Sequence, residues 1–417
     1  MAVKQTFVIV GAGLAGAKAA QTLRDEGFDG RVVMIGSETN PPYNRPPLSK
    51  GYLRGERTRA SILVHDDAFY ADHDIELLLA TRVTGIFPRE GQVETDASKH
   101  RIDYDSLLLA TGSRPRKLAV PGSDLDGIHY LRTLGDSDRL RHELKSASRL
   151  AVVGAGWIGS EVAASAREMG VDVVLLDPNG NPLERIMGPQ VGAVLRRLHA
   201  AHGVEFRPSS RVRSFLGDGA VDGIRTASGE IIPADRVVVG VGVIPRTELA
   251  IEAGLLMENG VATDDQLRTS APRIYAAGDV ANAWHPLFRL RLRVEHWATA
   301  RDGGILAAQN MLGQGRSYDR IPHFLSTQYD FNIEYAGHAS RWDQVVFRGE
   351  PASSGGFLAF WLLGGRVVAG MSANVPNVHH DIEHLVRSGR QVSPDMLADS
   401  EVPLDAVADE ASRLQRL

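Results

Sequence analysis

The amino-acid sequence predicts an α/β protein in which two similar βαβ units are followed by a small α+β domain. Three observations carry this prediction: a glycine pattern G-x-G-x-x-G after residue 10, the same pattern after residue 153, and a β-hairpin signal in the last hundred residues. Each glycine pattern lies between a strand-like and a helix-like run, which is the context that the pattern needs. Its recurrence in that context indicates an architecture rather than a chance match.

The first unit begins with the strand-like run TFVIV, which leads directly into Gly11, Gly13 and Gly16. In such a loop the first glycine permits a tight turn, the second lets backbone approach a diphosphate, and the third lets the helix pack close to the strand. A helix expected over 17–26 then presents its free N–H groups to the diphosphate. The pattern therefore predicts a Rossmann-like dinucleotide site.

Acidic residues follow two strands of this unit. The strand expected over 31–36 ends before Ser37 and Glu38, and Glu38 lies roughly 20 residues after the glycine loop, where an acid can bind ribose hydroxyls. A later strand, 273–277, delivers Gly278 and Asp279. Asp279 could bind the polyol of a flavin or cap the helix that follows, and both roles stay open.

A proline-rich segment, YNRPPLSK, places Arg45 and Lys50 just beyond the first strand pair. Taken alone, it is typical of a surface loop with solvated charges. A buried-type strand over 105–111 then ends at Gly112, and a linker follows.

The second unit repeats the opening pattern. A strand over 149–153 precedes Gly154, Gly156 and Gly159, a helix runs to about residue 169, and the next strand ends at Asp177. Asp177 again stands where a ribose-binding acid is expected. No Arg or Lys directly follows it to meet a 2′-phosphate, which favours NADH over NADPH, although Arg185 is a cation nearby in sequence. Two bound dinucleotides are therefore implied.

Composition narrows the class of protein. A chain of 417 residues is too long for a single ordinary hydrophobic core, so we expect two or three domains. The net charge of −5 argues against a general nucleic-acid binder. We find neither a signal peptide nor an apolar run long enough to span a bilayer, so we expect a cytoplasmic protein without a membrane partner. The chain contains no cysteine, so its redox work would need a bound cofactor and an external acceptor.

Motifs along almost the whole chain resemble the FAD-dependent ferredoxin:NAD reductase family of oxygenase systems, and more distantly apoptosis-inducing factor. They are VIVGAGLAG, RPPLSK, LLLATGSRPR, HYLRT, VVGAGWIGSEVA, GVGVIP, IYAAGDVA, VEHWATA and QYD. The resemblance implies a glutathione-reductase-like architecture with FAD in the first unit and NADH in the second. It assigns FAD binding to Gly11, Gly13, Ala15, Gly16, Glu38, Arg45, Lys50, Val83, Arg132, Asp279 and Trp297. It assigns NADH binding to Gly154, Gly156, Gly159, Glu161, Asp177 and Gly242. The candidate set also includes Ser37, Ala110, Thr111, Gly112, Ile158, Gly278 and Glu295.

The same resemblance suggests catalytic roles. Lys50 and Glu161 are expected to meet near the reacting nitrogen of the flavin, where a paired cation would favour electrons arriving on the ring. A helix opened by Glu295, His296 and Trp297 and running to about residue 311 is expected to point its N-terminus at the flavin pyrimidine. Trp297 would contact the flavin, but it could equally be ordinary core.

The C-terminal part departs from the family pattern. The family has F-W-S-D-Q where this chain has Phe324, Leu325, Ser326, Thr327 and Gln328, so the aromatic residue usually over the flavin is missing. Further on, FLAFWLL and RVVAGMS flank Gly364-Gly365 and predict a hairpin.

Two other clusters have ordinary explanations. His379, His380 and His384 resemble a metal box but fit a solvated helix better, so we expect no metal. Arg289, Arg291 and Arg293 alternate with leucines and predict a strand with one basic face, either solvated or docking an acidic protein.

We therefore expect an FAD-binding domain formed by 1–112 and 246–321, an NADH-binding domain over 113–245 and a C-terminal domain over 322–417. The expected function is transfer of a hydride from NADH to FAD and then of single electrons to a ferredoxin that serves an oxygenase, with a monomer favoured. One alternative is an NADH dehydrogenase or oxidase that uses quinone or other small acceptors. Another is an NADH-responsive redox sensor like apoptosis-inducing factor.

Overall fold

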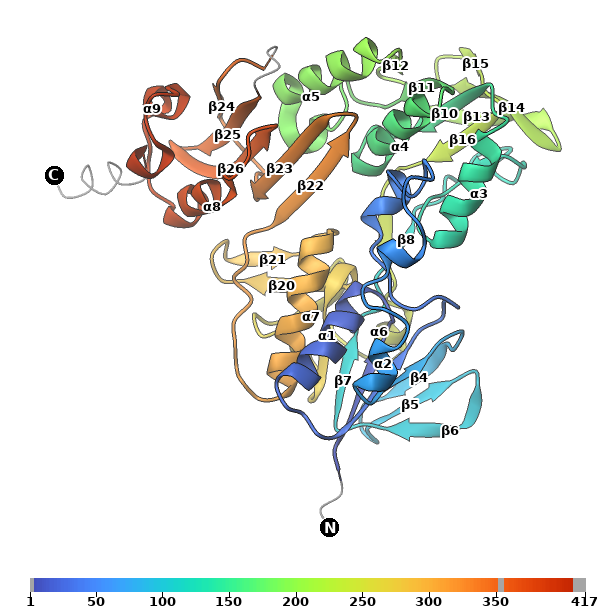
Figure 1. Ribbon diagram of the computed structural model, residues 1–417, viewed down its shortest axis with the longest axis vertical. Coiled ribbons are helices and arrows are strands. Elements are labelled where there is room, and N and C mark those ends of the chain that lie inside the picture. The colour runs from blue at the N-terminus through green and yellow to red at the C-terminus, as the bar shows by residue number, and fades with distance from the viewer. Residues whose placement is uncertain (1–3, 352–355, 408–417) are drawn as a thin grey trace. The chain divides into compact units, whose positions relative to one another are not determined.

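A computed structural model describes residues 4–351 and 356–407 of the chain (Figure 1). Contacts divide the chain into two compact units, and each unit is assembled from separated segments. The first consists of Met1–Arg45, Thr58–Arg114 and Val243–Arg320. The second consists of Pro46–Arg57, Pro115–Gly242 and Ile321–Leu417. The three expected domain boundaries stay a prediction.

The first unit is built on a five-stranded parallel sheet in the order β19-β7-β1-β2-β3. Its strands are β19 (Ile274–Ala276), β7 (Ser106–Leu109), β1 (Thr6–Val10), β2 (Arg31–Ile35) and β3 (Ile75–Leu78). Strand β1 has β2 on one side and β7, which comes much later in the chain, on the other. The strand order therefore reverses at β1, and sheets of this kind bind dinucleotides outside the carboxyl end of the strand at such a reversal.

Two helices of the first unit pack against each other beside this sheet, α1 (Leu14–Asp25) and α7 (Trp297–Met311) (Figure 1). A methyl group added at Gly304 would lie 2.2 Å from the backbone oxygen of Ala15, so a side chain at Gly304 would push the helices apart. Two small three-stranded sheets also belong to the unit. The first is antiparallel and consists of β4 (Val83–Phe87), β5 (Gln92–Thr95) and β6 (Ser98–Asp103). The second is mixed: β20 (Ala281–His285) pairs in parallel with β18 (Val261–Thr263) and antiparallel with β21 (Leu290–Leu292).

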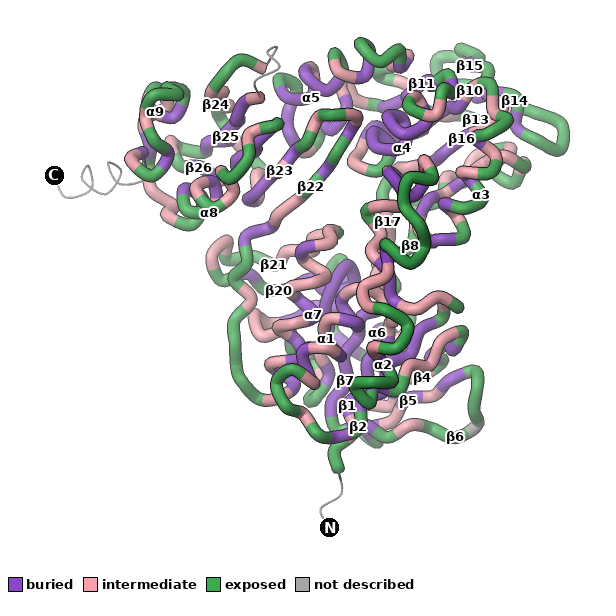
Figure 2. Tube along the Cα trace, in the orientation of Figure 1, coloured by how far each residue is buried: buried purple, intermediate pink, exposed green. Residues whose placement is uncertain are grey.

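The second unit contains a parallel sheet of the same design, in the order β12-β11-β10-β16-β9. Its strands are β12 (Glu205–Arg207), β11 (Asp172–Leu176), β10 (Arg149–Val153), β16 (Arg236–Val239) and β9 (Ile128–His129). Helix α4 (Trp157–Glu168) follows β10 as α1 follows β1. The repeated glycine pattern therefore marks a repeated fold, as the sequence predicts. Buried residues, purple in Figure 2, follow the central strands of both sheets.

The C-terminal part of the second unit is an antiparallel sheet in the order β22-β23-β26-β25-β24. The strands are β22 (His323–Gln328), β23 (Phe331–Gly337), β26 (Arg366–Ala373), β25 (Phe357–Leu363) and β24 (Gln344–Arg348), followed by α8 (His379–Ser388) and α9 (Pro394–Ala398). The expected hairpin is confirmed: β25 and β26 pair around Gly364 and Gly365, whose φ angles of 56° and 74° suit a two-residue turn.

One hydrophobic core joins this antiparallel sheet to α5 (Glu184–Ala201) of the same unit. Trp361 is fully buried, and its indole N–H donates to the backbone oxygen of Met187 in α5 over 3.1 Å. This shared core explains why the C-terminal sheet and the second parallel sheet form one unit.

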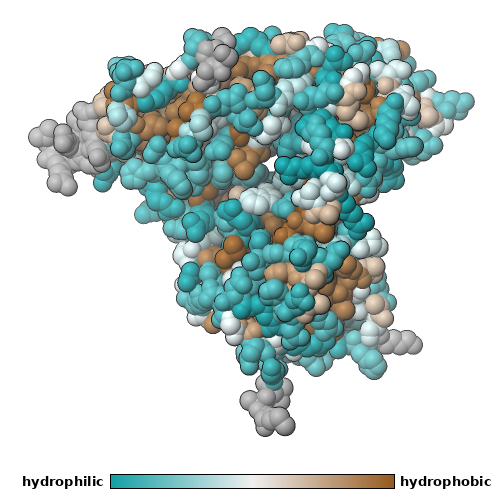
Figure 3. Space-filling view, viewed as in Figure 1, coloured by the Kyte–Doolittle hydropathy of each residue, from teal (hydrophilic) through white to brown (hydrophobic). Residues whose placement is uncertain are grey.

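Among the described residues, none of the helices is both long enough and apolar enough to cross a membrane. The face seen in Figure 3 is largely hydrophilic, with hydrophobic residues gathered in limited areas. Leu325 and Ile158, both in the second unit, are among the large hydrophobic side chains that remain exposed.

Candidate cofactor sites

The first glycine loop has the geometry that its sequence predicts. The N–H of Gly11 donates to the oxygen of Ile35 over 2.8 Å, which holds the turn against β2. Gly11 has a φ of 126°, and an added methyl group would lie 2.1 Å from the Ala110 oxygen. A methyl group at Gly16 would lie 2.0 Å from the Gly11 oxygen. These two positions therefore require glycine.

Gly13 differs from its neighbours in the loop because it faces open space. It is the N-cap of α1, so no side chain caps this helix, and a methyl group added there would meet nothing within 4 Å. The N–H groups of the first turn are thus not capped by the side chain of the N-cap residue. Such a helix N-terminus binds phosphate groups, so the loop fits a dinucleotide diphosphate.

Glu38 is held by two residues of the proline-rich segment. Its carboxylate accepts hydrogen bonds from the Tyr43 hydroxyl over 2.6 Å and from the Arg45 guanidinium over 2.7 Å. Asp279, at the end of β19, accepts a hydrogen bond from the Ser113 hydroxyl over 2.6 Å. Both acids are therefore fixed in orientation within the first unit, one after β2 and one after β19.

Trp297 is the first residue of α7, two residues after the expected opening of this helix at Glu295. The ring of His296 caps the helix by accepting from the N–H of Ala298 over 3.2 Å. The Trp297 indole N–H donates to the side-chain oxygen of Asn44 over 2.7 Å. This bond ties the start of α7 to the proline-rich segment, and the contact of Trp297 with a flavin stays a prediction.

The second glycine loop repeats the geometry of the first. A methyl group added at Gly159 would lie 1.9 Å from the Gly154 oxygen, whereas one added at Gly156 would meet nothing within 4 Å. Asp177 ties the loop to the end of β11, since it accepts from the N–H of Ala155 over 2.7 Å and from the side chain of Asn179 over 2.7 Å. The loop therefore also fits a dinucleotide.

The structure brings Lys50 and Glu161 together inside the second unit. The Lys50 ammonium lies 2.8 Å from the Glu161 carboxylate, and the side chain of Glu161 is only 6% exposed. Ser49 and Ser326 donate their hydroxyl groups to the same carboxylate over 2.5 Å and 2.8 Å. The buried charge is thus neutralised by one cation and solvated by two hydroxyl groups, as a buried carboxylate requires.

The candidate residues fall into two groups. The first unit holds Gly11, Gly13, Ala15, Gly16, Ser37, Glu38, Arg45, Val83, Ala110, Thr111, Gly112, Gly278, Asp279, Glu295 and Trp297. The second holds Lys50, Arg132, Gly154, Gly156, Ile158, Gly159, Glu161, Asp177 and Gly242. Lys50 and Arg132, assigned to FAD by the resemblance, are therefore in the unit that carries the second glycine loop.

Sequence reasoning missed several polar partners of the predicted residues. Ser49 and Ser326 at Glu161, Ser113 at Asp279 and Asn44 at Trp297 were not candidates. Ser49 and Ser113 directly neighbour Lys50 and Gly112 in the sequence, which is the one signal that could have found them.

The strand expected at 289–293 is confirmed for residues 290–292, which form β21. Arg289 is exposed, whereas the other two arginines of the run pair with acids of the same unit. Arg291 pairs with Glu258 over 3.1 Å, and Arg293, whose side chain is 11% exposed, pairs with Glu295. The run therefore does not offer a continuous basic docking surface.

Comparison with known proteins shows which family has this pair of glycine loops. The sequence profile named "pyridine nucleotide-disulphide oxidoreductase" matches residues 5–304, which contain both glycine loops. The chain belongs to this family. A second profile, "reductase C-terminal", matches residues 323–408. Although the family name refers to a disulphide, this member contains no cysteine.

Similar oxidoreductases of the family match nearly end to end. Rhodocoxin reductase of Rhodococcus erythropolis is 38% identical, with 96% of this chain and 93% of the relative covered. The ferredoxin–NAD(+) reductase component of the anthranilate 1,2-dioxygenase system of Burkholderia cepacia is 39% identical, with 95% and 98% covered. The crystal structure of the covalent putidaredoxin reductase–putidaredoxin complex matches with a TM-score of 0.93 and 35% identity, covering 98% of this chain and 99% of that one. The expected family and fold class are thereby confirmed.

Proposed function

We propose that this chain is an FAD-dependent reductase that takes a hydride from NADH and passes single electrons to a ferredoxin serving an oxygenase. The observation that carries the proposal is a pair of intact dinucleotide loops in one chain that lacks any thiol. Two dinucleotides can exchange a hydride, whereas a chain without cysteine must deliver electrons to a separate acceptor. The ferredoxin reductases matched along nearly their full length support this choice of acceptor.

The residues of each unit have distinct tasks in this proposal. In the first unit, the loop from Gly11 to Gly16 and the N-terminus of α1 hold the FAD diphosphate, and Glu38 binds its ribose. In the second unit, the loop from Gly154 to Gly159 holds the NADH diphosphate, and Asp177 binds its ribose. Three of the lone pairs of Asp177 are already used by the Ala155 N–H and by two donors of Asn179, so the carboxylate is preorganised for one further donor.

When bound, FAD supplies the chemistry that converts a two-electron hydride into single electrons. The chain's own contribution is to position the nicotinamide and to stabilise negative charge, for which Lys50 is the candidate. The carboxylate of Glu161, fixed by Ser49 and Ser326, would hold the Lys50 ammonium in place. A fixed cation stabilises developing charge without having to reorganise during the reaction.

A second candidate function rests on Leu325. This residue stands where the family pattern has tryptophan, and it is 45% exposed. A smaller aliphatic side chain covers less area than an indole ring, which favours direct reduction of quinones or other small acceptors. The chain would then act as an NADH dehydrogenase.

Steady-state assays separate the two functions. The purified protein should be yellow with about one FAD per chain, and its NADH-dependent reduction of cytochrome c should require an added ferredoxin. Quinone or oxygen reduction at the rate of the best ferredoxin would support the dehydrogenase instead. A correctly folded protein that could not be loaded with FAD would contradict both. The expected monomer stays a prediction, which analytical ultracentrifugation would test.

A further inference from the structure

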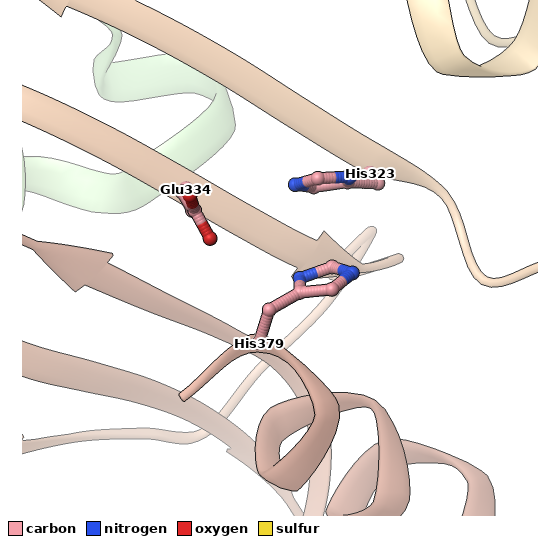
Figure 4. A group of neighbouring side chains, drawn as sticks. All are labelled: His323, Glu334 and His379. Carbon is pink, nitrogen blue, oxygen red and sulfur yellow. The ribbon is translucent and has the colours of Figure 1, made fainter. Parts of the chain in front are cut away.

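Three side chains with metal-binding chemistry converge at the edge of the C-terminal sheet (Figure 4). His323 is the first residue of β22, Glu334 is in the middle of β23, and His379 begins α8. In the β22–β23 ladder His323 pairs with Ala336, and Leu325 pairs with Glu334. His323 and Glu334 are therefore diagonal neighbours on the same face of the sheet. Helix α8 packs on β23 and β26 and brings His379 to them.

The cluster is compact and partly accessible. One potential ligand atom from each of the three residues lies within 4.8 Å of the other two, and all three residues are half-buried. The rings of His323 and His379 have centroids 3.9 Å apart and planes inclined by 32°. Figure 4 shows the Glu334 carboxylate pointing toward the two imidazoles. An ion could thus reach the cluster from solvent and contact all three side chains.

Two imidazoles and one carboxylate are a donor set that suits Zn²⁺ and similar divalent transition metals. Three protein ligands leave the fourth tetrahedral position for water. With bonds of about 2.1 Å, tetrahedral ligand atoms are about 3.4 Å apart. The observed 4.8 Å is an upper limit on the present separations, so small side-chain rotations would close the site around an ion.

Glu383 provides the outer contact that metal-binding histidines usually have. Its carboxylate lies 3.3 Å from Nε2 of His379, one helical turn away in α8. A histidine that binds a metal through one nitrogen commonly donates its other N–H to a carboxylate, which fixes the ring. The pairing leaves Nδ1 of His379 for the ion. With neutral imidazoles, Glu334 and Glu383 also supply two negative charges to balance a divalent cation.

We propose that His323, Glu334 and His379 form a binding site for a divalent transition metal such as Zn²⁺, with Glu383 orienting His379. A bound ion would link the β22–β23 hairpin to α8. The site uses none of the residues assigned to FAD or NADH, and the inference does not rest on the proposed function. It also differs from the group of His379, His380 and His384 on one helix, for which the sequence predicts no metal, because His380 and His384 are both exposed and lie outside the cluster.

Calorimetric titration with ZnCl₂ tests the site on the untagged, FAD-loaded full-length protein after chelator treatment. We expect one Zn²⁺ per chain with micromolar or tighter affinity, and no comparable heat from MgCl₂ because Mg²⁺ prefers oxygen ligands. His323→Ala and His379→Ala should each weaken binding at least a hundredfold. Glu383→Gln should weaken it about tenfold, as loss of an outer contact does.

His380→Ala is the matched control, because His380 neighbours His379 but its side chain is 94% exposed and reaches Glu383 only through an exposed 4.0 Å ion pair, which contributes little. It should leave Zn²⁺ affinity unchanged. Zn²⁺ should also raise the thermal unfolding midpoint of the parent protein and of His380→Ala, but not that of His379→Ala.

Two results would overturn the proposal: no Zn²⁺ binding to the parent protein at millimolar concentration, or equal loss of affinity in His380→Ala and His379→Ala. Flavin absorbance and far-ultraviolet circular dichroism establish that each variant is folded. Should an alanine variant misfold, the nearly isosteric Glu334→Gln tests the same site, and retained affinity in that variant would equally refute it.

Discussion

The ion pair between Lys50 and Glu161 gives a prediction whose size can be worked from the structure. At 2.8 Å and an effective dielectric constant of about 20, the gross attraction is about 6 kcal/mol, most of which is offset by desolvation. Lys50→Met would leave a carboxylate that is only 6% exposed with two hydroxyl donors and no cation. We expect this change to lower the free energy of unfolding by about 3 kcal/mol.

Glu161→Gln should cost less, about 1–2 kcal/mol, because the Lys50 side chain is 20% exposed and its ammonium can regain water. In the double variant neither group is left as an unpaired charge. Its loss should therefore be smaller than the sum of the single losses by about 1–2 kcal/mol.

Urea unfolding followed by circular dichroism would measure this double-mutant cycle. Arg139→Met is a suitable control, since Arg139 forms a 3.3 Å pair with Asp136 in the same unit but is 64% exposed. It should change stability by less than about 0.5 kcal/mol. Losses that simply add, or a Lys50→Met loss no larger than that of Arg139→Met, would refute the buried-pair argument.

The same variant tests the proposed catalytic role. In stopped-flow mixing with NADH, FAD-loaded Lys50→Met should reduce its flavin at least tenfold more slowly, because a charge that stabilises the transition state is lost. Unchanged reduction kinetics would make Lys50 a structural residue only.

Three further perturbations test separate parts of the account. Asp177→Ala should raise KM for NADH at least tenfold, which corresponds to about 1.4 kcal/mol of lost binding, and should lower kcat less. In the parent protein, equal kcat/KM for NADH and NADPH would contradict the assignment of Asp177 to the ribose. Gly13→Ala should fold normally because the added methyl group meets nothing within 4 Å, yet retain less FAD after gel filtration; full retention would count against the diphosphate site. Burial lowers the pKa of His199 to about 4 from its usual 6.5, so between these two values the unfolded chain binds a proton that the folded protein does not. The free energy of unfolding should therefore fall by about 3 kcal/mol as the pH is lowered from 6.5 to 4. Urea midpoints of His199→Gln should lack this component, and an unchanged pH profile would show that His199 is not its source.

The sequence was sufficient for the parallel sheets and both glycine loops because those features are local. The apolar strand, the glycine spacing and the acid after the next strand all occur within a single βαβ unit. Gly11, Gly16 and Asp177 therefore have the surroundings expected of them. The turn at Gly364 and Gly365 was equally local and is confirmed.

Features that join distant segments were harder to predict. Serines have no characteristic spacing, so apart from the position of Ser49 beside Lys50 nothing in the sequence indicated that Ser49 and Ser326 bind Glu161. The acid that neutralises Arg291, Glu258, is outside the arginine run, which made that run look like a free basic face. Likewise, the His323–Glu334–His379 cluster unites two strands and a helix, whereas sequence alone drew attention to histidines adjacent along one helix.

The most direct test of the central claim is an anaerobic single turnover. One equivalent of NADH is mixed with the FAD-loaded protein, and the reduced protein is then mixed with an oxidised ferredoxin from an oxygenase system. We expect bleaching of the flavin absorbance, followed by its return as about two ferredoxins are reduced per NADH. Flavin that stays oxidised with NADH, or reduced flavin that returns to the oxidised state with quinone but never with any ferredoxin, would contradict it.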